Sequence, residues 1–415
     1  MKIILMLFLS VALFATDLTI EVRKKVDSLP SLALEDSSIN YDTNFKMRFF
    51  KALFADMNVL SLFNVDKHRR LTYFNATSVV LANKDMDYVL RYKLFEDDNG
   101  RLNVEIKFLH DNNAVFAKTY KISKKSAYVF LAHAIAYDIN KYMGGDDIGW
   151  IKKRVVFANI VAPKKSEIVV ADYTLTYRHV VLKGGFNIFP KWANKRQDAI
   201  YYTALGGAKP ALKYFDIRHG KIDTVATSDG MIVCSDVSED GKRLLVTMAP
   251  AAQPDIYLYN VSDKSFKRLT RYGGIDVSGQ FLGKNKIVFV SDRLGYPNIF
   301  AKNLSSSSVE QLVYYGKTNS ACSVHGNYIV YEARESSNAF SKNTFNLHLI
   351  SLKSDFIRRL TATGVNQFPR FSDDGDAVLF IKNYKNQSAI GVIRLAYNKN
   401  YLFPIRHGRI QSLDW

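Results

Sequence analysis

The side chains in this chain that could do chemistry are spaced in no recognisable catalytic or metal-binding motif. None of the eight histidines belongs to a His-Glu-x-x-His pair or stands beside paired cysteines that could bind zinc. A metal site could arise only where the fold brings distant ligands together. The histidines stand at positions 68, 110, 133, 179, 219, 325, 348 and 407.

Nucleotide and acyl-transfer chemistry also lack support. Gly316-Lys317-Thr318 resembles the end of a phosphate loop, but Gln311 stands where the first glycine should be. The Gly-x-Ser-x-Gly elbow of serine hydrolases does not occur. The acidic pairs at 97–98 and 373–374 fall in expected turns, where solvated loop residues explain them. We therefore expect no catalytic residue, no cofactor and no metal, and a binding protein instead of an enzyme.

Net charge and cysteine content limit which classes of partner and which cellular compartment fit the chain. A formal charge of +18 is compatible with nucleic acid, an anionic membrane surface or an acidic partner. The basic residues are scattered in short pairs, which favours a solvated basic surface, and export argues against nucleic acid. Cys234 and Cys322 are far too few for a disulfide scaffold, so they are expected to be buried thiols, with a single bridge as the alternative.

The first fifteen residues have the pattern of a secretory signal. Lys2 is followed by an apolar run too short for a stable membrane helix, and Thr16 and Asp17 follow at once. We expect cleavage after Ala15, with a start at Leu18 or a retained anchor as alternatives. The mature chain is then expected to have no transmembrane segment.

A repeat of about 44 residues dominates the second part of the chain. Six β-branched or aromatic runs begin at positions 155, 199, 243, 286, 328 and 377, with spacings of 44, 44, 43, 42 and 49. Most follow a shorter strand and a tight turn, such as Phe371-Ser-Asp-Asp-Gly375, and lead into a third and fourth strand. A four-stranded blade has this period, so the repeat predicts a six-bladed β-propeller. A β-sandwich array is the alternative.

The first and last repeats complement one another. The run at Val155 lacks a preceding turn strand, whereas Arg409–Trp415 ends the chain 44 residues after Phe371. We predict that this last strand completes the first blade and closes the ring, which would leave no long unpaired edge.

The 44-residue period is absent before the propeller. An apolar stripe over 45–54 predicts a helix, followed by an extended return over 60–65. Strands are expected at 88–94, 102–108 and 115–122, and a second helix at 126–143 stopped by Gly144-Gly145. The chain is thus expected to be multidomain: a signal at 1–15, a small α/β (α+β) domain at 16–145, a linker at 146–153 and the propeller at 154–415.

Two motifs carry a resemblance to a known family. Ser291-Asp-Arg-Leu-Gly-Tyr-Pro-Asn-Ile-Phe300 resembles the Ser-Asp-Arg-x-Gly-x-Pro-x-Ile-Tyr motif of TolB-like propellers, and Phe368–Gly375 resembles their Pro-x-Phe-Ser-Pro-Asp-Gly motif with Asp373 in place of proline. The order of signal, α/β domain and six blades is also similar. The turn at Phe281–Asn285 and the segment after Asp17 depart from the family.

The resemblance implies a periplasmic component of the Tol-Pal system, which supports outer-membrane integrity and constriction at division. It implies that the propeller binds the peptidoglycan-associated lipoprotein Pal and that the N-terminal region binds TolA, with other outer-membrane or peptidoglycan-associated proteins as further candidates. The alternative is an exported propeller enzyme or a carbohydrate-binding lectin that works in the central channel.

Loops that join the outer strand of one blade to the inner strand of the next are expected to form the partner face, because functional residues gather on the loops of rigid scaffolds. Glycine and asparagine suit such turns whatever their function, so each loop alone is ambiguous. The predicted face residues are Asn187, Met231, Asp276, Asn319, Asn366, Gln367 and Arg409.

The stretch after the signal alternates polar and apolar residues. It could add as an edge strand to a partner, or it could be the first strand of its own domain. The residues predicted for the partner contact are Thr16, Asp17, Leu18, Thr19 and Ile20.

Overall fold

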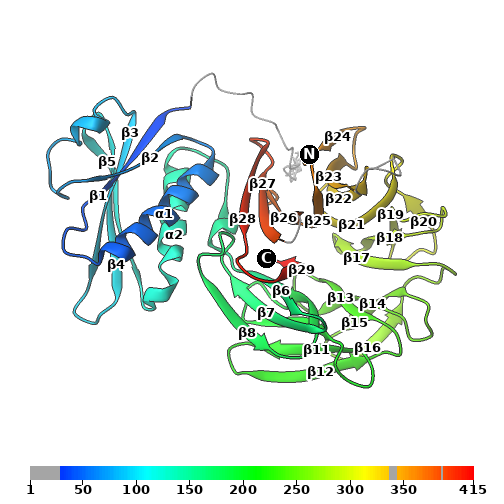
Figure 1. Cartoon of the computed structure of the whole chain (residues 1–415). Helices are drawn as coiled ribbons and strands as arrows, with labels where there is room; N and C mark the ends of the chain where they lie inside the picture. The colour runs from blue at the N-terminus through cyan, green and yellow to red at the C-terminus, as the bar shows by residue number, and fades with distance from the viewer. Residues whose placement is uncertain (1–28, 336–343, 385–386) are drawn as a thin grey trace, which may run out of the picture.

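A five-stranded sheet with two helices forms the N-terminal part of the chain, and a ring of β-sheets forms the rest (Figure 1). The computed structural model describes residues 29–335, 344–384 and 387–415. The expected signal and the partner segment Thr16–Ile20 lie outside the described residues. The exact domain boundaries at 145 and 153 stay a prediction.

The N-terminal sheet has the order β2-β1-β3-β4-β5, in which β1 runs parallel to β2 and to β3. This mixture of parallel strands and hairpins with two helices is the α/β arrangement expected from the sequence. The strands are β1 (Ser31–Asp36), β2 (Asn64–Leu71), β3 (Tyr88–Glu96), β4 (Leu102–His110) and β5 (Asn113–Ile122). The α-helices are α1 (Thr43–Leu60) and α2 (Val129–Tyr142), and short 3-10 helices are η1 (Leu81–Asn83), η2 (Lys125–Ala127) and η3 (Gly149–Lys152).

Helix α1 carries the predicted apolar stripe but is longer than expected. Phe45, Phe49 and Leu53 are buried against the sheet. The expected extended return over 60–65 is wrong in its first half, since the helix continues to Leu60. It ends at Ser61, which adopts a left-handed φ of 62° and donates its N–H to the Asn58 carbonyl.

The ring consists of six four-stranded blades, counted over the described residues, and the sheets of the fifth and sixth are joined by one strand pairing, Phe345 with Val365. Each predicted run is the second strand of its blade. From inner to outer strand the blades are β29 (Arg409–Asp414), β6 (Val155–Ala162), β7 (Lys165–Ala171), β8 (Arg178–Lys183); β9 (Asn187–Trp192), β10 (Ala199–Ala204), β11 (Ala211–Asp216), β12 (Lys221–Thr227); β13 (Ile232–Val237), β14 (Arg243–Met248), β15 (Asp255–Asn260), β16 (Ser265–Arg268); β17 (Asp276–Leu282), β18 (Lys286–Ser291), β19 (Asn298–Asn303), β20 (Val309–Gln311); β21 (Lys317–His325), β22 (Tyr328–Arg334), β23 (Phe345–Ser351), β24 (Ile357–Arg359); β25 (Val365–Phe371), β26 (Ala377–Tyr384), β27 (Gln387–Arg394), β28 (Lys399–Pro404).

The last strand closes the ring as predicted. Strand β29 pairs antiparallel with β6, and its residues Ile410 and Leu413 are buried. The indole Nε1 of Trp415 donates to the Phe371 carbonyl at 2.8 Å, and its ring packs against Trp150. The closed ring excludes the alternative of an open sandwich array.

The two parts of the chain share one apolar core, which runs from the N-terminal sheet through Trp150 to blades one and six. Arg394 of β27 is fully buried at this seam. Its guanidinium donates to the carbonyls of Val59 and Leu60 at 3.1 and 3.0 Å, at the negative end of α1, and lies 2.7 Å from an Asp376 carboxylate oxygen. A propeller arginine therefore caps a helix of the other domain.

A buried cluster of charged side chains lies at the same seam. Asp56 of α1 accepts hydrogen bonds from His133 of α2 at 2.8 Å and from the Tyr173 hydroxyl at 2.5 Å, and Asp172 lies 3.4 Å from the second ring nitrogen of His133. Burial alone would lower the pKa of His133, but the two carboxylates outweigh it and raise the pKa to about 9. His133 is therefore an imidazolium that joins the two parts of the chain.

Candidate partner-binding face of the propeller

Strand direction places the loops of the propeller on two opposite ends. Because strands alternate in direction, the loops from an outer strand to the next inner strand share one end with the hairpins between second and third strands. We call this end the mouth face. The opposite end carries Tyr173 and Arg394, which contact Asp56 and the last carbonyls of α1 in the N-terminal domain. The mouth face therefore points away from that domain.

Four of the seven predicted face residues have buried side chains. Asn187, Asp276, Asn319 and Asn366 are at most 8% exposed. The Nδ2 group of Asn319 donates to the side chain of Asn298 and to the Tyr315 carbonyl. In this conformation these four side chains are turned away from solvent and hold the loops in shape, and their contact with a partner stays a prediction.

Asn187 and Asn366 act in the same way. The Nδ2 group of Asn187 donates to the Gly184 carbonyl at 2.8 Å, and that of Asn366 donates to the carbonyls of Phe345 and Thr363. A short amide side chain can satisfy the carbonyls of a tight turn from within, which is why asparagine occurs there.

The remaining three predicted residues lie nearer to solvent. Met231 is 41% exposed and Arg409 is also exposed. Gln367 is partly buried, donates to the Glu332 carboxylate at 3.2 Å and accepts from the Asn383 amide. Burial raises the pKa of Glu332 to about 7.

The motif at 291–300 fixes two mouth loops together. Arg293 donates to both Asp276 carboxylate oxygens at 3.1 and 3.2 Å and stacks on the Tyr272 ring. The Asp292 carboxylate accepts the N–H of Ile275 at 2.7 Å. Gly295, with a φ of 83°, turns the hairpin back. The motif thus clamps the loop before β17 to the hairpin after β18.

Apolar side chains that the sequence reasoning missed stand out from these loops. Ile275 is 45%, Leu294 44%, Tyr314 73% and Tyr315 66% exposed. With Met231 they lie on consecutive mouth loops of blades three to five, and we call these five residues the mouth patch. Exposed apolar groups gathered on one face are typical of protein interfaces. The sequence feature that could have indicated this patch is the aromatic pair Tyr314-Tyr315, which stands between two expected strands and next to Gly316.

Possible metal-binding groups, cysteines and apolar helices are the remaining features that bear on function over the residues that the structure describes. There, no group of three or more His, Cys, Asp or Glu side chains is placed to hold a metal ion. Cys234 and Cys322 are free and buried, as expected. None of the helices between residues 29 and 415 that the structure describes combines the length and apolarity that a membrane crossing needs.

Known proteins resemble the chain over its whole length. Residues 145–415 match the model of the TolB beta propeller domain. The Tol-Pal system protein TolB of Wolinella succinogenes is 47% identical over 422 residues, with 100% of both chains covered, and that of Campylobacter jejuni is 42% identical with 97% of both covered. The crystal structure of TolB from Acinetobacter baumannii has the same fold, with a TM-score of 0.76 at 19% identity over 95% of this chain and 98% of that one. The chain belongs to the TolB family of the Tol-Pal system.

Proposed function

We propose that this protein is a periplasmic scaffold of the Tol-Pal system that binds Pal on its mouth face and TolA through its N-terminal segment. In this role it supports outer-membrane integrity and constriction at division, and it catalyses no reaction. Family membership supports the system to which it belongs. The observation that carries the binding face is the mouth patch, and the Arg293 clamp fixes the two of its loops that carry Ile275 and Leu294.

The aromatic pair of the mouth patch is the part best suited to anchor a partner. Tyr314 and Tyr315 are the most exposed residues of the patch. Tyrosine offers large contact area with few rotatable bonds, and aromatic anchors dominate the energy of most interfaces. The partner is therefore expected to bury both rings.

The test is the affinity of the mature protein for Pal with Tyr314 and Tyr315 changed to serine. Loss of aromatic anchors costs about 2 kcal/mol or more, so the Kd is expected to rise by roughly 30-fold. The matched control is Tyr73→Ser, because Tyr73 is also 73% exposed but lies in the N-terminal domain. Unchanged affinity of the double variant would remove the mouth patch as the Pal-binding face.

The TolA contact needs a separate experiment. Removing residues 16–20 from the mature protein is expected to abolish capture by TolA and to leave Pal binding intact. Capture of TolA by the shortened protein would refute the assignment of Thr16–Ile20. Charge reversal of Arg409 adds a further test of the mouth face, whereas reversal of buried Asp276 would damage the blade itself.

A further inference from the structure

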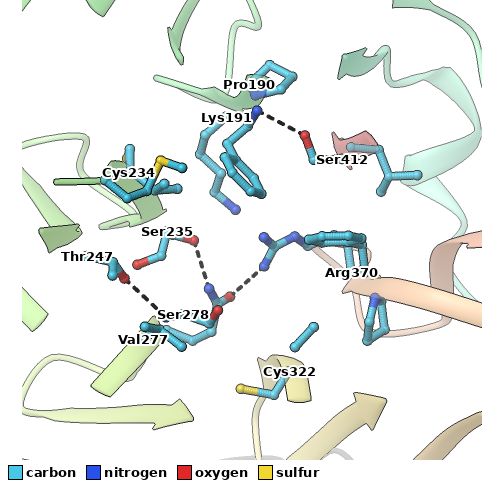
Figure 2. A pocket seen from close by; sticks show the side chains of 18 residues that line it. Pro190, Lys191, Cys234, Ser235, Thr247, Val277, Ser278, Cys322, Arg370 and Ser412 are labelled. Atoms are coloured by element: carbon cyan, nitrogen blue, oxygen red, sulfur yellow. Dashed lines mark hydrogen bonds between the residues drawn. The ribbon is translucent and has the colours of Figure 1, made fainter. Parts of the chain in front are cut away.

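The channel of the propeller contains a cavity of about 230 Å³ that all six inner strands line (Figure 2). The inner strands run from the mouth face toward the opposite end, and the exposed residue Met231 belongs to the lining. The cavity therefore opens on the mouth face. Drug-sized ligands usually occupy about 300–1,000 Å³, so an occupant of this cavity must be smaller.

Strained backbone surrounds this cavity. Phe189, Ser278, Ala321 and Phe368 have φ values of 51°, 57°, 43° and 51°, in the left-handed region that side chains other than glycine rarely adopt. All four line the cavity, and each lies at a bulge in its inner strand. Bulges re-aim side chains and are frequent beside functional sites, where such strain persists.

Two cations lie at the inner end of the cavity, near the ends of β9 and β25. In Figure 2 the Lys191 amine and the Arg370 guanidinium both extend into the middle of the cavity. The 18 lining residues include no aspartate or glutamate. Nη1 of Arg370 donates to Gln280 at 3.1 Å, but its buried Nε has no hydrogen-bond partner.

The acidic groups that balance these cations stand outside the lining. Asp414 lies 2.8 Å from the Lys191 amine and 3.9 Å from Nε of Arg370, and Asp236 lies 3.4 Å from Lys191. Each carboxylate also accepts a backbone N–H, from Trp192 and from Phe281. The carboxylates are thus held in the wall, and the cations are the charged groups that a molecule in the cavity would meet.

We propose that the channel binds a small organic acid. Its carboxylate accepts hydrogen bonds from Arg370 and Lys191, and its short apolar body contacts Phe189, Val277 and Phe368. A concave, mostly apolar cavity with a few convergent polar groups is the usual form of a small-molecule site, and a guanidinium is well suited to a carboxylate.

The test is calorimetric titration of the mature protein with butyrate and with pentanoate at constant ionic strength, because each has one carboxylate and a short apolar body. Saturable binding is expected for the wild type. For Arg370→Gln we expect binding weaker by about tenfold or more, as for loss of a hydrogen bond to a charged group. Lys267→Gln is the matched control, because Lys267 is exposed on β16 and its loss lowers the net charge equally. Arg370→Lys, which keeps the charge, should bind with intermediate affinity.

Two results would overturn the proposal. One is the absence of saturable binding of either acid to the wild-type protein, which requires no variant to fold. The other is equal weakening in Arg370→Gln and Lys267→Gln, which would show general attraction of anions to a basic protein.

Discussion

Shortening Leu413 in the closing strand should destabilise the whole propeller. Leu413 is 2% exposed in β29, opposite Phe157 of β6. Replacing a buried leucine by alanine costs about 2–5 kcal/mol, because apolar contacts are lost and a cavity remains. A loss of about 3 kcal/mol should lower the thermal midpoint by roughly 6–12 °C, on the scale of domains of 150–250 residues. Ile222→Ala, at a 43% exposed position of the outer strand β12, is the control and should change the midpoint little.

Deleting residues 409–415 extends this test. The deletion removes the two buried apolar side chains of β29, Ile410 and Leu413, and exposes the edge of β6. The expected loss of at least about 6 kcal/mol is comparable to the net stability of a whole domain. Circular dichroism melting would measure both variants. A deletion variant that melts with the wild type would show that the ring does not depend on its closing strand.

Three further variants test other buried charges. His133→Leu leaves Asp56 buried without its cation and should lower the free energy of unfolding in denaturant by about 3–5 kcal/mol. In the wild type the stabilisation by His133 is complete below pH 6.5 and is lost as the pH rises through about 9. A variant whose stability depends on pH as the wild type does would contradict the pairing. The pKa of Glu332 is raised from 4.5 to about 7, so its contribution of about 3 kcal/mol to stability is present below pH 4.5 and lost as the pH rises through 7. Glu332→Gln should flatten the dependence of stability on pH between 4.5 and 7. An equally steep dependence in the variant would argue against the raised pKa. Arg293→Leu leaves buried Asp276 without its cation, which should lower the free energy of unfolding by about 3 kcal/mol and weaken Pal binding. Wild-type stability of this variant in urea unfolding would show that the clamp is dispensable.

The propeller could be predicted from sequence because its signals are local and repeated. Each β-branched run begins at the first residue of a second strand, for example Val155 of β6 and Ala377 of β26. Turn chemistry such as Asp-Gly marks the same hairpins in successive blades. Strand β1 was missed and only the first two residues of β2 were expected, because β1 pairs only with strands far along the chain and β2 follows a helix whose end depends on the left-handed Ser61.

The binding face was harder to predict because side-chain direction in a loop depends on tertiary packing. Asn319 suits a turn, but the sequence does not show that its amide is turned inward onto Asn298. Tyr314 and Tyr315 have the composition of a core strand, yet the path of their loop exposes them. The channel cations could have been found, since Lys191 and Arg370 each precede the aromatic residue that ends an inner strand.

The seam between the two parts of the chain limits how such proteins can diversify. Arg394 and Asp376 belong to the sixth blade, but their partners include the carbonyls of α1 and the indole of Trp150. If the propeller alone were replaced, the arginine at the position of Arg394 would lack the α1 carbonyls that accept its hydrogen bonds. A buried charge without such partners is costly. An exchange of the propeller alone is therefore expected to lower stability unless the end of α1 that accepts from Arg394 is exchanged with it.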